Sequence, residues 1–143
     1  MALPDGRYRI FNAENEKYAP AFYDSDTVKM NITGNVDLEI KNESGAQMIR
    51  FNDRRVNPST SNWFGYNTNL QPDNRVIQRT EKHGLTGDNL LWAITPAGSD
   101  LYSIKVWNAD AAWTLPDNPR NPTDIYLEPA EGKRSQLWKI REA

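Results

Sequence analysis

The segment Gln136-Leu137-Trp138-Lys139-Ile140, near the end of the chain, carries the pattern from which the fold can be predicted. Trp138 and Ile140 are two residues apart, so in a β-strand their side chains point to the same face. The same arrangement occurs 46 residues earlier in Leu90-Leu91-Trp92-Ala93-Ile94. A weaker copy, Val36-Asp37-Leu38-Glu39-Ile40, lies a further 54 residues earlier. Repetition at a period of about 45 to 50 residues predicts an architecture of three similar units.

A second strand-like segment accompanies each copy and again places two large side chains on one face. These pairs are Tyr8/Ile10, Ile49/Phe51 and Tyr102/Ile104. We expect the alternating side chains to fill the interior of the domain, where each large apolar side chain contributes roughly 1.5–3 kcal/mol by burial.

Proline and glycine divide the rest of the chain into short apolar runs. Nine prolines and eight glycines leave runs of four to eight residues, which are lengths typical of strands. Twelve candidate strands follow, in three sets of four: 7–12, 18–24, 28–32 and 36–41; 47–52, 62–67, 75–80 and 89–95; 101–107, 112–115, 124–128 and 136–141. This pattern predicts an all-β protein of the β-trefoil class, in which six strands form a short barrel and six form hairpins that cap it. We expect one domain over residues 1–143, with repeats at approximately 1–45, 46–98 and 99–143.

The net charge and the absence of cysteine exclude several classes of function. The formal net charge of −2 gives no electrostatic reason to bind nucleic acid or an anionic membrane. The sequence contains no cysteine, which excludes a disulfide framework, a thiolate nucleophile and a cysteine-ligated zinc site. The start of the chain lacks the basic and apolar segments of a signal peptide. We therefore expect a cytoplasmic protein, or one exported without a conventional leader.

Residues for catalysis are scarce. His83 is the only histidine and lies in the polar segment Thr80-Glu81-Lys82-His83-Gly84. Nothing marks a nucleophile elbow, a phosphate-binding glycine loop or a complete calcium loop. The sequence predicts a protein that is not an enzyme and that uses no metal or cofactor.

Both ends of the chain resemble small mushroom β-trefoil proteins. The start, Leu3-Pro4-Asp5-Gly6-Arg7-Tyr8-Arg9-Ile10, and the end, Gln136-Leu137-Trp138-Lys139-Ile140-Arg141-Glu142, carry this resemblance. The group includes the mycocypins, which inhibit cysteine proteases, and the cocaprins, which inhibit cysteine and aspartic proteases. The Gln-x-Trp-x-Ile ending is also similar to that of ricin-B-like lectins. The resemblance implies reversible occlusion of the cleft of papain-like cysteine proteases, with aspartic proteases as a second target class and carbohydrate binding as the alternative. Whether the protein forms a homodimer is left open.

The resemblance also indicates which loops would contact a protease. Mycocypin-like inhibitors use the loops between strands one and two and between strands three and four, whereas cocaprin-like inhibitors use the loop between strands two and three. Carried over to this sequence, the residues are Ala13, Glu14 and Asn15; Gly34 and Asn35; and Tyr23, Asp24, Ser25, Asp26 and Thr27.

Two longer loops stand apart from these. The segment 52–61 contains Arg54-Arg55, and its Asn57 is followed by Pro58, which argues against a substrate-like loop for an asparagine-specific protease. The segment 115–122 contains prolines at 116, 119 and 122. Because proline restricts the backbone, we expect this second loop to be extended, rigid and suited to a preformed contact.

The lectin alternative depends on a sugar site in the third repeat. Trp107 and Trp113 could supply an aromatic platform, Asp110 a carboxylate and Gln136 an amide. In the competing interpretation, Trp113 points into the core. In the second repeat, Trp63 and Phe64 are neighbours, so as strand residues one of them should face solvent.

Overall fold

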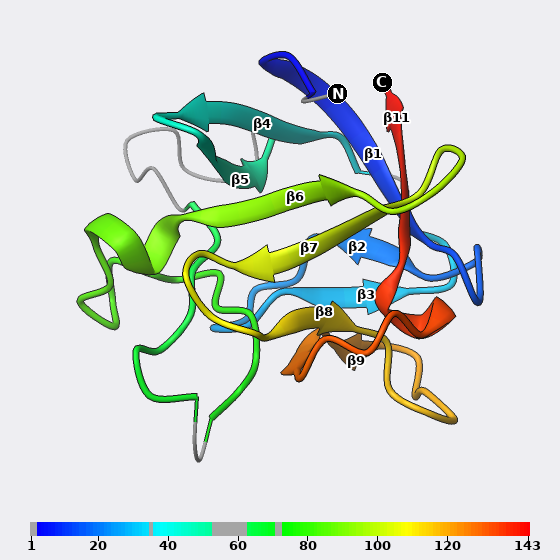
Figure 1. Ribbon diagram of the computed structural model, residues 1–143. Helices are drawn as coiled ribbons and strands as arrows, with labels where there is room; N and C mark the ends of the chain where they lie inside the picture. The colour runs from blue at the N-terminus through cyan, green and yellow to red at the C-terminus, as the bar shows by residue number, and fades with distance from the viewer. Residues whose placement is uncertain (1–2, 35, 53–62, 71–72) are drawn as a thin grey trace.

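The computed structural model describes residues 3–34, 36–52, 63–70 and 73–143 (Figure 1). Within these residues the chain forms eleven strands and two short 3-10 helices. In chain order they are β1 (Gly6–Asn12), β2 (Ala19–Ala21), β3 (Lys29–Asn31), β4 (Leu38–Glu43), β5 (Ala46–Phe51), η1 (Gly87–Leu90), β6 (Trp92–Pro96), β7 (Tyr102–Val106), β8 (Ala112–Thr114), β9 (Thr123–Asp124), β10 (Tyr126–Glu128), η2 (Arg134–Gln136) and β11 (Trp138–Glu142). Neither helical segment has the length or apolar character that a membrane crossing needs, and the described chain has no other helix.

Six strands close into a barrel. They pair in the order β7, β11, β1, β4, β5 and β6, and pairing of β6 with β7 closes the ring. The longest ladder joins β4 to β5, from Leu38 opposite Phe51 to Glu43 opposite Ala46. The remaining strands form β2–β3–β9 and the β8–β10 pair. A six-stranded barrel with additional hairpin strands is the β-trefoil that the sequence predicts, and the fold prediction is confirmed.

Three tryptophans occupy the centre of the core. Trp92, Trp113 and Trp138 are fully buried, and Trp113 contacts each of the other two edge-on, with ring centroids 5.7 Å apart. The indole of Trp92 donates to the carbonyl of Phe64 at 3.1 Å, and that of Trp138 donates to the carbonyl of Trp113 at the same distance. The two tryptophans of the repeated sequence therefore have both the same burial and the same type of hydrogen bond. Apolar burial and satisfied indole donors together explain why these positions fix the fold.

The second repeat departs from the predicted strand pattern. In the described parts of 62–67 and 75–80, Gly65 and Ile77 make only isolated bridges instead of a ladder. The backbone of Asn89 passes so close to Gly65 that a β-carbon there would lie 2.8 Å from the carbonyl oxygen of Asn89. The backbone on either side bonds in other directions, with the N–H of Phe64 donating to Ile49 and that of Tyr66 donating to Asn89.

Candidate functional site

The β2–β3 hairpin divides the predicted protease-binding loops between two places. Ala19 pairs with Asn31 and Ala21 pairs with Lys29, so the two strands run antiparallel. The loop joining β1 to β2 and the turn after β3 therefore lie at one end, and the loop joining β2 to β3 lies at the other (Figure 1). The mycocypin-like and cocaprin-like assignments thus correspond to opposite ends of one hairpin.

The β1–β2 loop is held by one buried side chain. Asn12 is fully buried at the end of β1, and its amide donates to the carbonyl of Ser135 at 3.0 Å. Its side-chain oxygen accepts the N–H groups of Glu14 and Asn15 at 3.0 and 3.1 Å. Asparagine commonly stabilises turns in this way, by hydrogen bonding to the backbone that follows it. Ala13 is buried, so Glu14 and Asn15 are the predicted loop residues that a partner can reach.

The turn after β3 rests against β2. A β-carbon at Gly34 would lie 2.3 Å from the carbonyl oxygen of Ala19, so only glycine fits without movement of the backbone. The N–H of Gly34 donates to the carbonyl of Asn31 at 3.2 Å. Gly34 therefore acts through backbone placement and has no side chain to offer a partner. Its predicted companion, Asn35, lies outside the described residues.

A third loop, residues 115–122, joins this end of the hairpin. The hydroxyl of the buried Tyr18 donates to the carbonyls of Pro119 and Arg120, both at 3.2 Å. The side-chain oxygen of Asn121 accepts the N–H of Ile32 at 3.2 Å. The proline-rich loop is thus hydrogen-bonded at its middle to Tyr18, the residue before β2, and at its end to the turn after β3.

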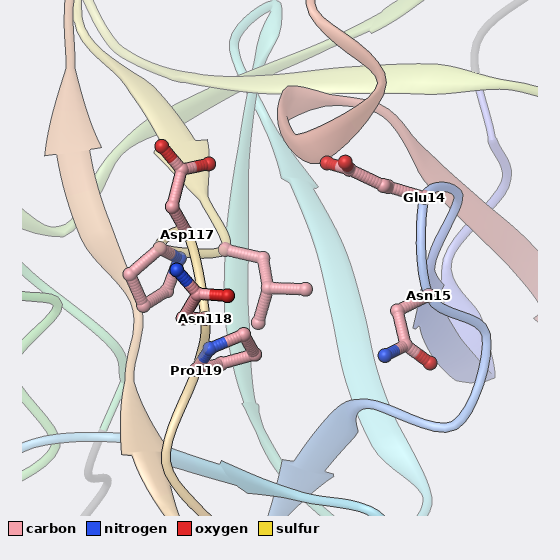
Figure 2. A pocket seen from close by; sticks show the side chains of 7 residues that line it. Glu14, Asn15, Asp117, Asn118 and Pro119 are labelled. Atoms are coloured by element: carbon pink, nitrogen blue, oxygen red, sulfur yellow. The ribbon is translucent and has the colours of Figure 1, made fainter.

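A groove separates this third loop from the β1–β2 loop. Its volume is about 420 Å³, and Figure 2 shows Glu14 and Asn15 on one side, with Asp117, Asn118 and Pro119 on the other. We call residues 13–17, 32–34 and 115–122 together the three-loop surface. It combines a rigid backbone, a polar groove and side chains from parts of the chain about a hundred residues apart.

The loop at the opposite end of the hairpin, between β2 and β3, is stabilised by ion pairs. The carboxylate of Asp26 pairs with Arg79 at 3.2 Å, Lys82 at 3.3 Å and His83 at 3.4 Å. Asp24 also pairs with Arg79. A hydrogen bond from Lys82 is the main reason that the pKa of Asp26 lies below its ordinary value.

The other predicted residues of this β2–β3 loop are largely occupied by contacts within the protein. Thr27 is buried and donates to the carboxylate of Asp124 at 2.6 Å, and the hydroxyl of Tyr23 accepts the amide of Asn31 at 2.9 Å. The hydroxyl of Ser25 accepts the N–H of Thr27 at 3.3 Å. Asp24, whose side chain is 90% exposed, is the residue of this loop most accessible to a partner.

The predicted sugar site does not assemble. Trp113 lies in the core, as the competing interpretation expected, and offers no face to a sugar. Gln136 is also buried, and its amide donates to the carbonyl of Pro129 at 2.9 Å and to the hydroxyl of Thr114 at 3.2 Å. Trp107 is partly accessible and Asp110 is exposed, so two of the four residues remain reachable.

One expectation about exposed aromatic residues is wrong. Trp63 and Phe64 are both buried, and neither lies in a strand, so the alternation expected of strand neighbours does not apply to them. The guanidinium of Arg50 lies 4.2 Å from the centre of the Trp63 ring and covers it, and that arginine also pairs with Glu39 at 2.7 Å. The outward face of Trp63 is therefore covered by a charged side chain, a cation–π contact that strand alternation cannot predict.

Groups suited to metal binding do not gather in the described part of the chain. No three side chains of the metal-ligating types come together there. His83 faces the carboxylate of Asp26, and its other neighbours in that network are cations. This arrangement is that of a structural ion-pair network. Arg54, Arg55 and Asn57 of the first long loop lie outside the described residues.

Comparison of the sequence with known proteins finds no relative, whereas comparison of the structure finds proteins of the same fold. No protein-family model matches the sequence, and neither does any curated protein. A search of solved structures, in contrast, finds similar folds. A mosquitocidal holotoxin matches 99% of this chain with a TM-score of 0.78 and 20% identity, and this chain spans only 18% of that toxin.

Two other matches extend over the whole of both chains. A proteinase inhibitor from Coprinopsis cinerea has a TM-score of 0.73 and 8% identity, with 99% of this chain and 100% of the inhibitor covered. A ricin B-like lectin from Macrolepiota procera, solved with lactose, has a TM-score of 0.73 and 16% identity, with 100% and 99% covered. At these identities the likeness establishes the fold alone. The chain is a β-trefoil whose structural neighbours include a mushroom proteinase inhibitor and mushroom ricin-B-like lectins.

Proposed function

We propose that this protein is a reversible protease inhibitor that binds through the three-loop surface. The observation that carries the proposal is the mutual support of the three loops. Asn12 fixes the first, Gly34 rests on β2 in the second, and Tyr18 and Asn121 hold the third. A loop that enters a protease cleft must be ordered before binding, since ordering it during binding costs affinity. A rigid loop also resists the rearrangement that would make it a good substrate.

The proposed mechanism is occlusion without covalent chemistry. Glu14 and Asn15 line one side of the groove, and Asp117, Asn118 and Pro119 of the proline-rich loop line the other (Figure 2). Papain-like cysteine proteases are the first proposed target class, and aspartic proteases are the second. The solved Coprinopsis inhibitor shares the fold and therefore shows that this scaffold is compatible with protease inhibition.

The first experiment is a titration of the purified protein against papain and pepsin with fluorogenic peptide substrates. We expect dose-dependent, reversible inhibition of papain, with pepsin testing the second class. No inhibition of either enzyme at tens of micromolar protein would reject the proposal.

A matched pair of double variants then tests the location of the site. Glu14→Ala/Asn15→Ala changes the three-loop surface, and Asp24→Ala/Ser25→Ala changes the opposite end of the hairpin. We expect the first pair to weaken papain inhibition by roughly tenfold or more, as truncation of central interface residues often does. The second pair should leave inhibition unchanged. The reverse result would assign inhibition to the β2–β3 loop.

Carbohydrate binding is the second candidate function. Its support is that Trp107 and Asp110 remain accessible at one turn of the third repeat. An indole face and a carboxylate are suitable partners for sugar C–H and hydroxyl groups. A glycan array tests this candidate, and Trp107→Ala should abolish any binding that depends on this turn.

A further inference from the structure

Ile32 differs from every other large apolar residue that the structure describes. It is the one member of that group that is exposed, with 44% of its surface accessible to solvent. A single exposed apolar side chain is ordinary on a protein surface and needs no special explanation by itself. Ile32, however, lies at the tip of the turn after β3, within the three-loop surface and next to the proline-rich loop.

The backbone that carries Ile32 is fixed on both sides. The N–H of Ile32 donates to Asn121 at 3.2 Å, and the N–H of Thr33 donates to the side chain of Asn31 at 3.1 Å. The Asn31 amide is itself oriented by a 2.9 Å hydrogen bond to the hydroxyl of Tyr23. Two residues beyond Ile32, Gly34 rests against the backbone of β2.

The chemistry of Ile32 suits a residue that becomes buried on binding. Its β-branched side chain has few rotamers, so burial costs little conformational entropy. Its immediate neighbours, Thr33 and Asn121, are exposed and polar. An apolar centre with a polar rim is the usual composition of an interface in which one side chain carries much of the binding energy.

We propose that Ile32 is the apolar anchor of the three-loop surface and that the target protease receives it in an apolar pocket of its cleft. This inference rests on the proposed inhibitory function and adds a partner class to it. Proteases whose clefts prefer apolar substrate side chains are the targets, and proteases whose clefts prefer charged side chains are poor ones. Asn121 is a positioning residue, because it holds the backbone of Ile32.

The test compares three proteins in papain inhibition assays: wild type, Ile32→Ser and Ile32→Val. Ile32→Ser should weaken inhibition by roughly tenfold or more. Ile32→Val removes one methylene group and should weaken inhibition by about fourfold at most. The melting temperature of both variants should match that of wild type, because the side chain is exposed.

A second measurement tests whether the protein prefers proteases whose clefts accept apolar side chains. Papain-like proteases are first sorted by their cleavage of peptides with an apolar or a charged residue near the cleaved bond. Wild type should inhibit the apolar-preferring enzymes at least tenfold more strongly.

The outcomes separate the two proposals. If wild type inhibits but Ile32→Ser inhibits equally well, or if both protease groups are inhibited equally, the anchor role is wrong and the inhibitory function stands. If wild type inhibits no protease, the inhibitory function fails and the anchor role fails with it.

Discussion

The two ends of the β2–β3 hairpin are stabilised by different interactions. At the three-loop surface, asparagine and tyrosine side chains bond to the backbone, as Asn12 and Tyr18 do. Two ion pairs accompany them in the described part of this surface, both made by Glu16, with Lys139 at 2.8 Å and with Arg141 at 3.9 Å. At the opposite end, Asp24 pairs with Arg79, and Asp26 forms ion pairs with Arg79 and Lys82.

This difference bears on which end can serve as a preformed binding surface. Hydrogen bonds between neutral groups do not depend on salt or on titration, and those of Asn12 are shielded from water by burial. Ion pairs between partly exposed groups are weak and are screened by salt. The three-loop surface should therefore keep its shape over a wide range of conditions, whereas the β2–β3 loop should loosen in acid and at high ionic strength.

The largest expected effect comes from Asn12→Ala. The substitution removes two hydrogen bonds to the β1–β2 loop and one of the two donors to the carbonyl of Ser135, which keeps the N–H of Leu115. We expect the free energy of unfolding to fall by about 2–4 kcal/mol, because three hydrogen bonds of a buried side chain are lost together. Chemical denaturation measures this loss.

Asn15→Ala is the matched control for that prediction. The side chain of Asn15 accepts only an exposed backbone hydrogen bond, from Lys17 at 3.2 Å. Its loss should change the free energy of unfolding by no more than about 0.5 kcal/mol, as surface substitutions usually do. Equal effects of the two variants would show that Asn12 does not organise the loop.

Tyr18→Phe should have an intermediate effect. It removes the hydroxyl that bonds to Pro119 and Arg120 and keeps the ring in the core. We expect a loss of about 1 kcal/mol in the free energy of unfolding, measured by denaturation. Papain inhibition should also weaken, because the proline-rich loop is no longer hydrogen-bonded to the end of the β1–β2 loop.

Tyr66→Phe is the control that separates a loss of stability from a loss of inhibition. The hydroxyl of Tyr66 donates to the carbonyls of Asp88 and Leu91, and burial raises the pKa of Tyr66 to about 12. This tyrosine therefore remains a donor at neutral pH, in a different part of the molecule. Its replacement should cost a similar amount of stability without weakening inhibition. If both variants weaken inhibition equally, the effect of Tyr18 is a general loss of stability and not a local one.

The sequence predicts the barrel well because barrel strands carry a local signal. Trp92 and Ile94 are two residues apart, as are Trp138 and Ile140, so each pair lies on one face of its strand. Burial of one strand face imposes this two-residue period wherever a ladder is continuous. The signal fails around Gly65, which makes only an isolated bridge to Ile77 and lies close to the backbone of Asn89.

The surface is harder to predict because its contacts join distant segments. Tyr18 is hydrogen-bonded to Pro119, which lies 101 residues away in the sequence. Asn121 is hydrogen-bonded to Ile32, which lies 89 residues away. Nothing in either segment alone indicates its partner. The position of Asn12, at a strand end before a polar loop, is a usable signal for a turn-forming side chain. The proline content of 115–122 indicates a stiff loop, but it does not indicate which neighbours the loop meets.

The smallest expected effect comes from Asp26→Asn at the opposite end of the hairpin. The pKa of Asp26 is lowered chiefly by the hydrogen bond from Lys82, so the folded protein binds a proton at this carboxylate less readily than the unfolded chain does. The stabilisation is therefore present in full above the ordinary value of 3.8 and is lost as the pH falls through the lowered folded value. Asp26→Asn should be slightly less stable than wild type at pH 7 and low salt.

That difference should disappear under two independent conditions, acid and high salt. Denaturation curves for wild type and Asp26→Asn should converge as the pH falls below the folded pKa of Asp26, because the wild-type carboxyl is then neutral as well. They should also converge at pH 7 when the ionic strength is raised, since the paired side chains are partly exposed. The loss caused by Asn12→Ala should persist at high salt, because it involves neutral groups. If salt removed both losses, the two ends of the hairpin would share one kind of stabilisation, and the reason for preferring the three-loop surface as the preformed one would be lost.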